Sequence, residues 1–246
     1  MTGSVRLKRP VALVTGGGGG LGRALVRFLA RDGFDVVVHY HRSARAAAES
    51  AADAETLGAQ TLCVGADLSR EEEALTMAEQ VRERFGVLDV LLNNAGVYQE
   101  TRGLELTAAQ WMEGLNTTVT QTFFTTRSLL SLLRAGTLRR VINLGDSSCD
   151  RPGARDLAWS YHIGKTGVWM LTRSFSVSEA PHGIAVNMVS PGFLDNSLGA
   201  LSPQEVPAGR LGTFEDVYAA VRFLALEAPV YITGSNLMVG GGWNLR

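Results

Sequence analysis

Cysteine is scarce in this 246-residue sequence, which contains only Cys63 and Cys149. The two lack the spacing of metal ligands, so we expect reduced thiols in a cytoplasmic protein and no metal site. Long apolar runs are also missing. No stretch reaches the roughly 18 residues that a membrane span requires, and residues 1–9 lack the apolar segment of a secretory signal. A net charge of −1 does not favour nucleic acid or an anionic membrane as a partner.

Hydrophobic residues are plentiful, at 46% of the chain, and no Pro/Ser-rich linker or block of charge divides them. A chain of this length can bury a large core, so residues 1–246 are expected to form a single domain. The predicted strands are 11–14, 34–39, 61–64, 88–92, 140–144, 184–189 and 235–239, and the predicted helices are 21–30, 43–57, 69–85, 107–133, 159–180 and one after Thr213. This alternation predicts an α/β fold, a single-domain, Rossmann-type, doubly wound parallel sheet of about seven strands with helices on both faces.

Three helix starts carry capping residues. Ser69-Arg-Glu-Glu72 has the pattern of a capping box, and Ser43 and Thr213 stand where a hydroxyl can cap a helix.

A run of five glycines, residues 16–20, joins the first predicted strand to the first helix. Glycine allows a tight turn and a close backbone approach, and the helix start offers free N–H groups and the positive end of its dipole. A pyrophosphate is the natural occupant of such a turn. The run satisfies both G-x-G-x-x-G and G-x-x-x-G-x-G, ending at Gly22, and a flexible turn without a ligand is the alternative.

Residues just beyond the carboxyl ends of the strands should lie nearest a ligand. The second strand is followed by His41, Arg42 and Ser43, with no carboxylate to hold the ribose 2′-hydroxyl of NAD. Arg42 and Ser43 instead offer donors for a 2′-phosphate, which favours NADP(H). A solvated charge at a helix start is the alternative for Arg42. Asp67, beyond the third strand, can meet the adenine amino group, and residues 93–96 beyond the fourth are small and polar.

Tyr161 and Lys165 stand at i and i+4 on a predicted helix, so they share one face. A lysine near a tyrosine favours the phenolate and brings its pKa towards a range useful for proton transfer. The pair alone is common on helices, and an ordinary helix face is the alternative.

From Val11 to Arg246 the chain resembles the short-chain dehydrogenase/reductase family. The matching motifs, in order, are Thr15-Gly16-x-x-x-Gly20-x-Gly22, Asp67, Asn93-Asn94-Ala95-Gly96, Asn116, Tyr161-x-x-x-Lys165, Asn187 and Pro191-Gly192. The resemblance implies that Tyr161 is the general acid, that Lys165 lowers its pKa and holds the nicotinamide ribose, and that Asn116 positions a water in a proton relay. The implied NADP(H) contacts are Thr15, Gly16, Gly20, Leu21, Gly22, His41, Arg42, Ser43, Asp67, Leu68, Asn94, Ala95, Gly96, Tyr161, Lys165, Pro191 and Gly192.

The fourth catalytic position is ambiguous, because most of the family has a serine there. Counting from the strand 140–144 places Asp146 at that position, whereas counting back 13 residues from Tyr161 places Ser148 there. We favour Asp146, since the sheet fixes the end of the strand and a loop lengthens easily. An aspartate there, together with residues 39–43 and Tyr98, resembles the pteridine and dihydropteridine reductase branch, although that branch often has an arginine at Gly20.

The first hypothesis is therefore an NADPH-dependent reductase of a C=N or C=O bond, with a dihydropterin as the favoured substrate, bound by Tyr98, Asp146 and Tyr161. The alternative is a 3-oxoacyl thioester or ketone reductase in which Ser148 polarises the carbonyl. A remote alternative is a non-catalytic NADP(H)-sensing protein, which would need a broken Tyr161 and Lys165 pair.

The resemblance also implies a homo-oligomer, a dimer or tetramer formed by helices 108–133 and 159–180, with Trp111 and Trp169 buried between copies. Asn196 replaces the threonine that many relatives place near the nicotinamide. Residues 193–209 are rich in Pro, Ser and Gly, and we expect them to act as a lid over a small-molecule substrate.

Overall fold

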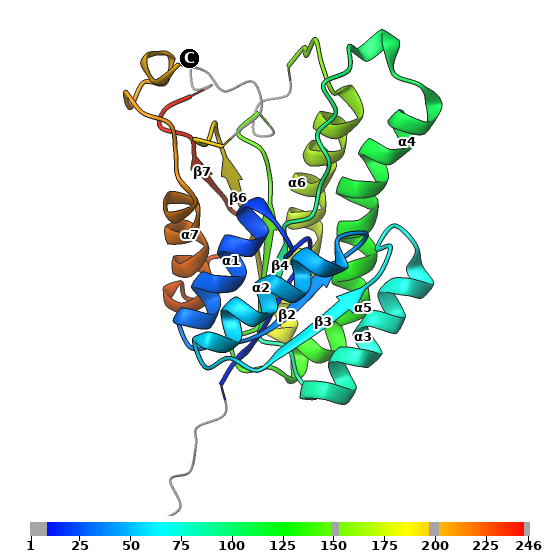
Figure 1. Cartoon of the computed structure of the whole chain (residues 1–246), viewed down its shortest axis with the longest axis vertical. Coiled ribbons are helices and arrows are strands. Elements are labelled where there is room, and N and C mark those ends of the chain that lie inside the picture. The colour runs from blue at the N-terminus through cyan, green and yellow to red at the C-terminus, as the bar shows by residue number, and fades with distance from the viewer. Residues whose placement is uncertain (1–8, 149–152, 197–201, 244–246) are drawn as a thin grey trace, which may run out of the picture.

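The computed structural model describes residues 9–148, 153–196 and 202–243. Cys149 and the middle of the expected lid lie outside these residues. Figure 1 shows one layered unit in which a twisted sheet is flanked by helices.

All seven strands run parallel, in the order β3-β2-β1-β4-β5-β6-β7. Their bounds are β1 Val11–Val14, β2 Asp35–Tyr40, β3 Thr61–Gly65, β4 Val90–Asn93, β5 Arg140–Leu144, β6 Ala185–Pro191 and β7 Asn236–Val239. The order reverses between β1 and β4, which is where such sheets hold ligands beyond their carboxyl ends. The predicted doubly wound sheet is confirmed.

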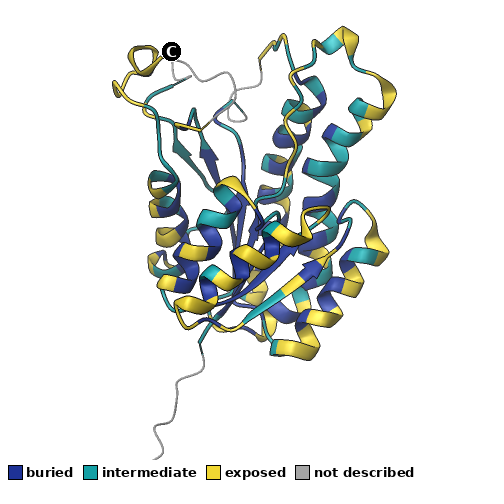
Figure 2. Ribbon diagram, viewed as in Figure 1, coloured by how far each residue is buried: buried dark blue, intermediate teal, exposed yellow. Residues whose placement is uncertain are grey.

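Helices cover both faces of the sheet, as predicted (Figure 1). The α-helices are α1 Gly20–Arg31, α2 Ala44–Thr56, α3 Glu71–Phe85, α4 Ala108–Leu115, α5 Gln121–Ala135, α6 Trp159–Glu179 and α7 Phe214–Arg222; short 3-10 turns are η1 Gly103–Glu105, η3 Ala180–His182 and η4 Pro203–Glu205; π turns are η2 Asn116–Thr120 and η5 Phe223–Glu227. Apolar side chains of α1, α2 and α7 form the core on one face, and those of α3, α5 and α6 form it on the other. The central strands are therefore buried on both sides, as Figure 2 shows.

The helix starts differ in how well local sequence predicts them. Thr213 accepts a hydrogen bond from the backbone of Asp216, so the predicted cap is confirmed. Ser43 stands at the N-cap of α2 without a side-chain cap bond. The capping box predicted at Ser69 is wrong, because α3 begins at Glu71 and the Ser69 hydroxyl donates instead to Asp67 Oδ1, 2.7 Å away. An ionised carboxylate two residues away is a stronger acceptor and fixes the loop at the end of β3.

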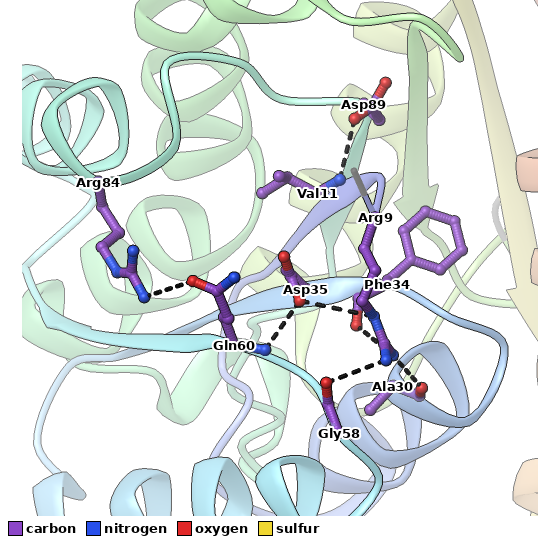
Figure 3. Close-up of polar contacts among 9 residues, drawn as sticks. All are labelled: Arg9, Val11, Ala30, Phe34, Asp35, Gly58, Gln60, Arg84 and Asp89. Atoms are coloured by element: carbon purple, nitrogen blue, oxygen red, sulfur yellow. Dashed lines mark hydrogen bonds and ion pairs between the residues drawn. The ribbon is translucent and has the colours of Figure 1, made fainter. Parts of the chain in front are cut away.

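The amino edge of the sheet is closed by polar contacts, drawn in Figure 3. Arg9 donates to the carbonyl oxygens of Gly58, Ala30 and Phe34, at distances of 3.0, 2.7 and 3.1 Å, and so ties the ends of α1 and α2 together. Asp35 accepts from the backbone of Gln60, and Asp89 accepts from the backbone of Val11. These contacts satisfy the buried carboxylates of Asp35 and Asp89, whereas the opposite, carboxyl edge of the sheet carries the large cavities described next.

Candidate active site

The glycine turn at the end of β1 has a backbone that other residues would strain. Gly16 and Gly20 have φ values of +65° and +50°, in the left-handed region that glycine adopts easily. A Cβ atom at Gly22 would overlap the carbonyl oxygen of Gly16 and lie 2.7 Å from the side-chain nitrogen of Asn94. At Gly22 the first turn of α1 therefore packs against the glycine turn and the end of β4 too closely for any side chain.

Thr15 joins the ends of β1 and β4 from behind this turn. Its buried hydroxyl oxygen accepts from the backbone N–H groups of Asn94 and Ala95, at 2.9 and 3.0 Å. The Asn94 amide in turn donates to the Thr15 carbonyl oxygen at 2.9 Å. These bonds hold the predicted residues of the two loops in one fixed arrangement.

His39 is a member of this scaffold that the sequence did not single out. Its ring is buried, with Nε2 lying 3.0 Å from the carbonyl oxygen of Ala66 and Nδ1 lying 3.3 Å from the backbone N–H of Gly16. Since a carbonyl only accepts, Nε2 carries the proton and Nδ1 accepts. Burial lowers the pKa of His39 to about 4, which keeps the ring neutral near pH 7. The available signal was a histidine in an otherwise apolar strand beside a glycine turn.

A cavity of about 930 Å³ lies along the carboxyl edge of the sheet beside this turn; we call it the first cavity. It is lined by these residues predicted from the sequence: Gly16, Leu21, Gly22, His41, Arg42, Ser43, Asp67, Leu68, Asn94, Ala95, Gly96 and Asn116. Arg42 and Ser43 are exposed at its rim. A dinucleotide fits this site because the glycine turn exposes backbone N–H groups at the start of α1, and Arg42 adds a cation at the rim.

Asp67 lies at the same end of the first cavity. Burial raises the pKa of its carboxyl group, but hydrogen bonds from Ser69 and the positive charges of His41 and Arg70 outweigh burial, so the net pKa is lowered. An ionised Asp67 can accept a hydrogen bond from an exocyclic amine, as the adenine hypothesis requires.

A second cavity of about 630 Å³ adjoins the first, and both are lined by Leu21 and Asn94. The second cavity contains the predicted residues Tyr98, Asp146, Ser148, Tyr161, Lys165, Pro191 and Gly192. Of the predicted cofactor residues, all within the described part of the chain, Thr15 and Gly20 alone line neither cavity. Thr15 acts from behind the loop, and Gly20 begins α1 at an exposed position.

Tyr161 and Lys165 lie on one face of α6, as their spacing predicted. The Lys165 side chain is buried and its ammonium donates to the carbonyl oxygen of Leu144, at 2.6 Å. The same nitrogen lies 5.6 Å from the centre of the Tyr161 ring. The arrangement puts a fixed positive charge beside a phenol in the wall of the second cavity.

Asp146 and Ser148 both line the second cavity. Counting from the strand 140–144 and counting back from Tyr161 therefore led to two residues of the same turn. Asp146 Oδ1 accepts from the Ser148 backbone N–H at 2.8 Å and also from the Ser148 hydroxyl. The loop thereby folds back at its start and brings Ser148 beside α6, where its hydroxyl oxygen lies 3.1 Å from His162 Nδ1. His162 was not singled out from the sequence, because the Tyr-x-x-x-Lys motif leaves its position undefined.

Aromatic rings also line the second cavity. The Tyr98 and Tyr161 rings meet edge to face with centres 5.2 Å apart, and Tyr98 also lies 6.0 Å from the His162 ring. The ring of Phe193, the first residue of the expected lid, lies with its centre 5.2 Å from that of Trp243, which the sequence did not place in this cavity. Burial, with Glu100 and Asp146 nearby, raises the pKa of Tyr98, so this phenol stays neutral.

Three predicted asparagines lie outside the second cavity. Asn116 begins the π turn η2 and lines the first cavity rather than the second, so its part in a proton relay stays a prediction. Asn187 joins β6 to the segment before β7: its amide donates to the Ile232 carbonyl oxygen and accepts from the Ser235 backbone N–H. Asn196 is exposed at the edge of the described residues.

Comparison with known proteins gives the family. The family model described as short chain dehydrogenase matches residues 10–205. The chain belongs to this family. The 3-oxoacyl-[acyl-carrier-protein] reductase FabG of Haemophilus influenzae is 32% identical over 94% of this chain and 97% of its own length. The acetoin dehydrogenase YohF from Salmonella typhimurium superposes with a TM-score of 0.84 at 27% identity, covering 97% of both chains. A short-chain type dehydrogenase/reductase from Mycobacterium marinum superposes with a TM-score of 0.88 at 26% identity, and the match covers 96% of both chains.

The family makes this protein an oxidoreductase of the NAD(P)(H)-dependent type. The relatives named here do not include a pteridine reductase, and FabG matches the alternative hypothesis better than the dihydropterin hypothesis. No helix in the described part of the chain is long and apolar enough to cross a membrane. Within the same residues, no three His, Cys, Asp or Glu side chains are grouped to hold a metal ion.

Proposed function

We propose that this short-chain dehydrogenase is an NADPH-dependent reductase of the ketone group in a 3-oxoacyl thioester or a similar small ketone. The observation that carries the proposal is the position of Ser148. Its hydroxyl lies in the same cavity as Tyr161 and Lys165 and is held there by Asp146. A hydroxyl and a phenol directed into one cavity are the two donors that a carbonyl oxygen needs.

The choice of NADPH rests on Arg42 and Ser43 at the rim of the first cavity. An arginine makes charge-assisted, often bidentate bonds to a phosphate, which a ribose hydroxyl does not offer. Arg42 also stands just before α2, where a positive charge is unfavourable unless an anion is bound nearby.

The bound nicotinamide would supply the hydride for the carbonyl carbon. The protein's own residues would orient the carbonyl group and supply the proton. Ser148 donates a hydrogen bond to the carbonyl oxygen, and Tyr161 transfers its proton to that oxygen as negative charge develops. Lys165 stabilises the resulting phenolate, since its ammonium is fixed beside the Tyr161 ring by Leu144. Gly96 has no side chain to cover the Lys165 ammonium, since a Cβ built there would lie in contact with its nitrogen, at 3.6 Å.

A dihydropterin remains the second candidate substrate because of one feature. Tyr98 presents an aromatic ring to the second cavity, with Phe193 and Trp243 also in its wall. Stacking on a flat heterocycle is worth about 0.5–1.5 kcal/mol beyond the area buried. Against this candidate, the Asp146 carboxylate already accepts two bonds from Ser148.

We also infer a homo-oligomer, formed through α4, α5 and α6. Ile163, Met170 and Val177 recur every seven residues on α6 and are exposed by 51, 69 and 77%, respectively. Apolar residues at this spacing form one stripe on a helix, which a second copy would cover.

The experiment is steady-state NADPH oxidation with an acetoacetyl thioester, acetoin and dihydrobiopterin. Four proteins are compared: the wild type, Ser148→Ala, Asp146→Ala and Tyr98→Ala. We expect turnover of the thioester or the ketone, a loss of roughly 10²-fold in kcat in Ser148→Ala, and a mild effect of Tyr98→Ala. Turnover of dihydrobiopterin alone, with Asp146 essential and Ser148 dispensable, would establish the pterin reductase instead. NADPH binding without turnover of any compound would favour the cofactor-sensing protein.

A further inference from the structure

His162 is a half-buried titratable side chain to which the mechanism above gives no part. It follows Tyr161 on α6, and its ring lies edge to face against both Tyr161 and Tyr98, with centres 5.4 and 6.0 Å away. Two aromatic neighbours at these angles fix the plane of the imidazole. The ring lines the second cavity and also a smaller one of about 410 Å³ beside Trp159 and Thr166.

The contacts of Ser148 determine which proton His162 carries. The Ser148 hydroxyl has one hydrogen and two lone pairs, and it contacts both Asp146 Oδ1 and His162 Nδ1. As a carboxylate, Asp146 can only accept, so the serine hydrogen points to Asp146. The 3.1 Å contact with Nδ1 is then a hydrogen bond only if Nδ1 is protonated and donates to the serine oxygen.

This arrangement affects the only proton that Ser148 can offer. When Nδ1–H donates to the serine oxygen, the hydroxyl can rotate between two acceptors, the Asp146 carboxylate and a substrate carbonyl. When Nδ1 is unprotonated, the ring becomes a third acceptor and draws the hydroxyl away from the cavity. A hydroxyl that accepts one hydrogen bond also becomes a stronger donor in the next.

We propose that His162 is a positioning residue: its Nδ1–H holds the Ser148 oxygen so that the serine hydroxyl points to the substrate carbonyl. This inference rests on the proposed function, because it assigns His162 a role through Ser148. His162 does not itself touch the reacting atoms, and a neutral donor in its place should support the reaction.

The charges around His162 set the direction of the pH dependence. Burial lowers its pKa below the usual value of 6.5, Asp146 opposes this, and Arg155 adds to it. Tyr98 and Glu100 from the loop after β4, and Tyr161 and Lys165 from α6, are the other titratable groups facing the same cavity. Near pH 7 the ring is neutral, and a fraction of it can adopt the wrong, Nε2–H tautomer. Below its pKa the imidazolium always carries a proton on Nδ1, so acid should favour the active arrangement.

The test compares His162→Asn with His162→Leu. Asparagine retains an N–H donor close to the position of Nδ1 and does not titrate, whereas leucine fills similar space without a donor. With the ketone or thioester substrate, we expect kcat to fall roughly 10-fold in His162→Leu, the effect of one hydrogen bond, and about threefold or less in His162→Asn. The KM for NADPH should be unchanged in both, and circular dichroism confirms that both are folded.

A pH profile supplies the readout that a packing role would not move. As the pH falls from about 7.5 to about 5.5, kcat/KM of the wild type should rise by up to about twofold more than that of His162→Asn, which keeps only the rise that comes from protonation of Tyr161. His182→Asn, at an exposed turn outside both cavities, is the matched control and should keep the wild-type profile. A wild-type rate in His162→Leu, or a rise on acidification that is as large in His162→Asn as in the wild type, would overturn the proposal.

The failure of this proposal can be told from failure of the proposed function. Ser148→Ala with full activity refutes the function assigned to Ser148, whereas an inactive Ser148→Ala with an unimpaired His162→Leu refutes the His162 inference alone. The tautomer is measured without any substrate from the 15N shifts of the His162 ring. We expect Nδ1–H in the wild type and a shift towards Nε2–H in Ser148→Ala; Nε2–H in the wild type would contradict the proposal.

Discussion

The ammonium nitrogen of Lys165 lies 2.6 Å from the carbonyl oxygen of Leu144, the last residue of β5. This hydrogen bond joins the helix that carries Tyr161 to the edge of the sheet. Lys165 is only 4% exposed, so its charge acts through a weakly screening surrounding. The bond therefore fixes both the position of α6 and the charge beside the Tyr161 phenol.

Replacing Lys165 with methionine should remove the charge and keep most of the side-chain volume. We expect kcat for ketone reduction to fall by roughly 10²-fold, since the phenolate loses its cation and the ribose its donor. Arg173→Met, an exposed change two turns further along α6, should leave kcat unchanged. Equal kinetics in Lys165→Met and the wild type would show that the ammonium does not act on Tyr161.

Tyr161→Phe tests the proton donor itself. The change removes one hydroxyl and leaves the ring contacts with Tyr98 and His162 in place. We expect kcat to fall by roughly 10²-fold or more while the affinity for NADPH, measured by fluorescence titration, stays within a factor of about two. A mutant that reduces its substrate at the wild-type rate would remove Tyr161 from the mechanism.

Arg42→Ala tests the choice of cofactor. The KM for NADPH should rise by roughly 10-fold or more because a charge-assisted bond to phosphate is lost, whereas kinetics with NADH should barely change. Arg45→Ala is the control, since Arg45 is exposed in the first turn of α2, three residues after Arg42, and pairs with Glu49. The same loss with both cofactors would mean that Arg42 does not distinguish them.

The sheet and most of its helices could be predicted because each is a local pattern. The apolar run 11–14 is a buried strand, and the seven strands and six helical stretches come in the predicted sequence. The long helix predicted at 107–133 is present but interrupted by the π turn η2 at Asn116–Thr120. A π turn adds one residue to a helical turn, and the pattern of apolar residues does not reveal it, because the helices α4 and α5 on either side keep their buried faces.

The second cavity was harder to predict because contacts between distant parts of the chain form it. Counting along the sequence made Asp146 and Ser148 alternatives for the fourth catalytic position. In the structure, one hydrogen-bonded turn places both in the second cavity. Trp243 reaches the same cavity from the far end of the chain and meets Phe193 there. The spacing of residues along the sequence does not predict a contact between two rings 50 residues apart.

Gly22→Ala should destabilise the protein and weaken cofactor binding together. The new Cβ would overlap the Gly16 carbonyl oxygen, and the backbone must move to relieve the overlap. Overpacking of this kind costs about 1–3 kcal/mol, which corresponds to a fall in Tm of roughly 3–10 °C for a chain of this size. Gly19→Ala is the control for Tm, because its φ of −157° suits any residue and no described atom lies within 4 Å of its Cβ.

His39→Asn should reduce the loss of stability in acid. The pKa of His39 is lowered to about 4 in the fold, against a usual value near 6.5, because burial disfavours the charged ring. As the pH falls from about 6.5 to about 4, the unfolded chain binds a proton that the folded chain does not, so the free energy of unfolding decreases. The difference between the two pKa values corresponds to about 3 kcal/mol.

The measurement is urea unfolding of the wild type, His39→Asn and His182→Asn at pH 7.0 and pH 4.5. At pH 7.0, His39→Asn should be less stable than the wild type by about 1–2 kcal/mol, because the bond to the Ala66 carbonyl is lost. Between the two pH values, it should lose about 2–3 kcal/mol less than the wild type, since asparagine does not titrate. Carboxyl groups contribute equally to all three proteins, and the exposed His182 should show the wild-type dependence. Parallel losses in the wild type and His39→Asn would mean that the His39 ring is already protonated in the folded protein.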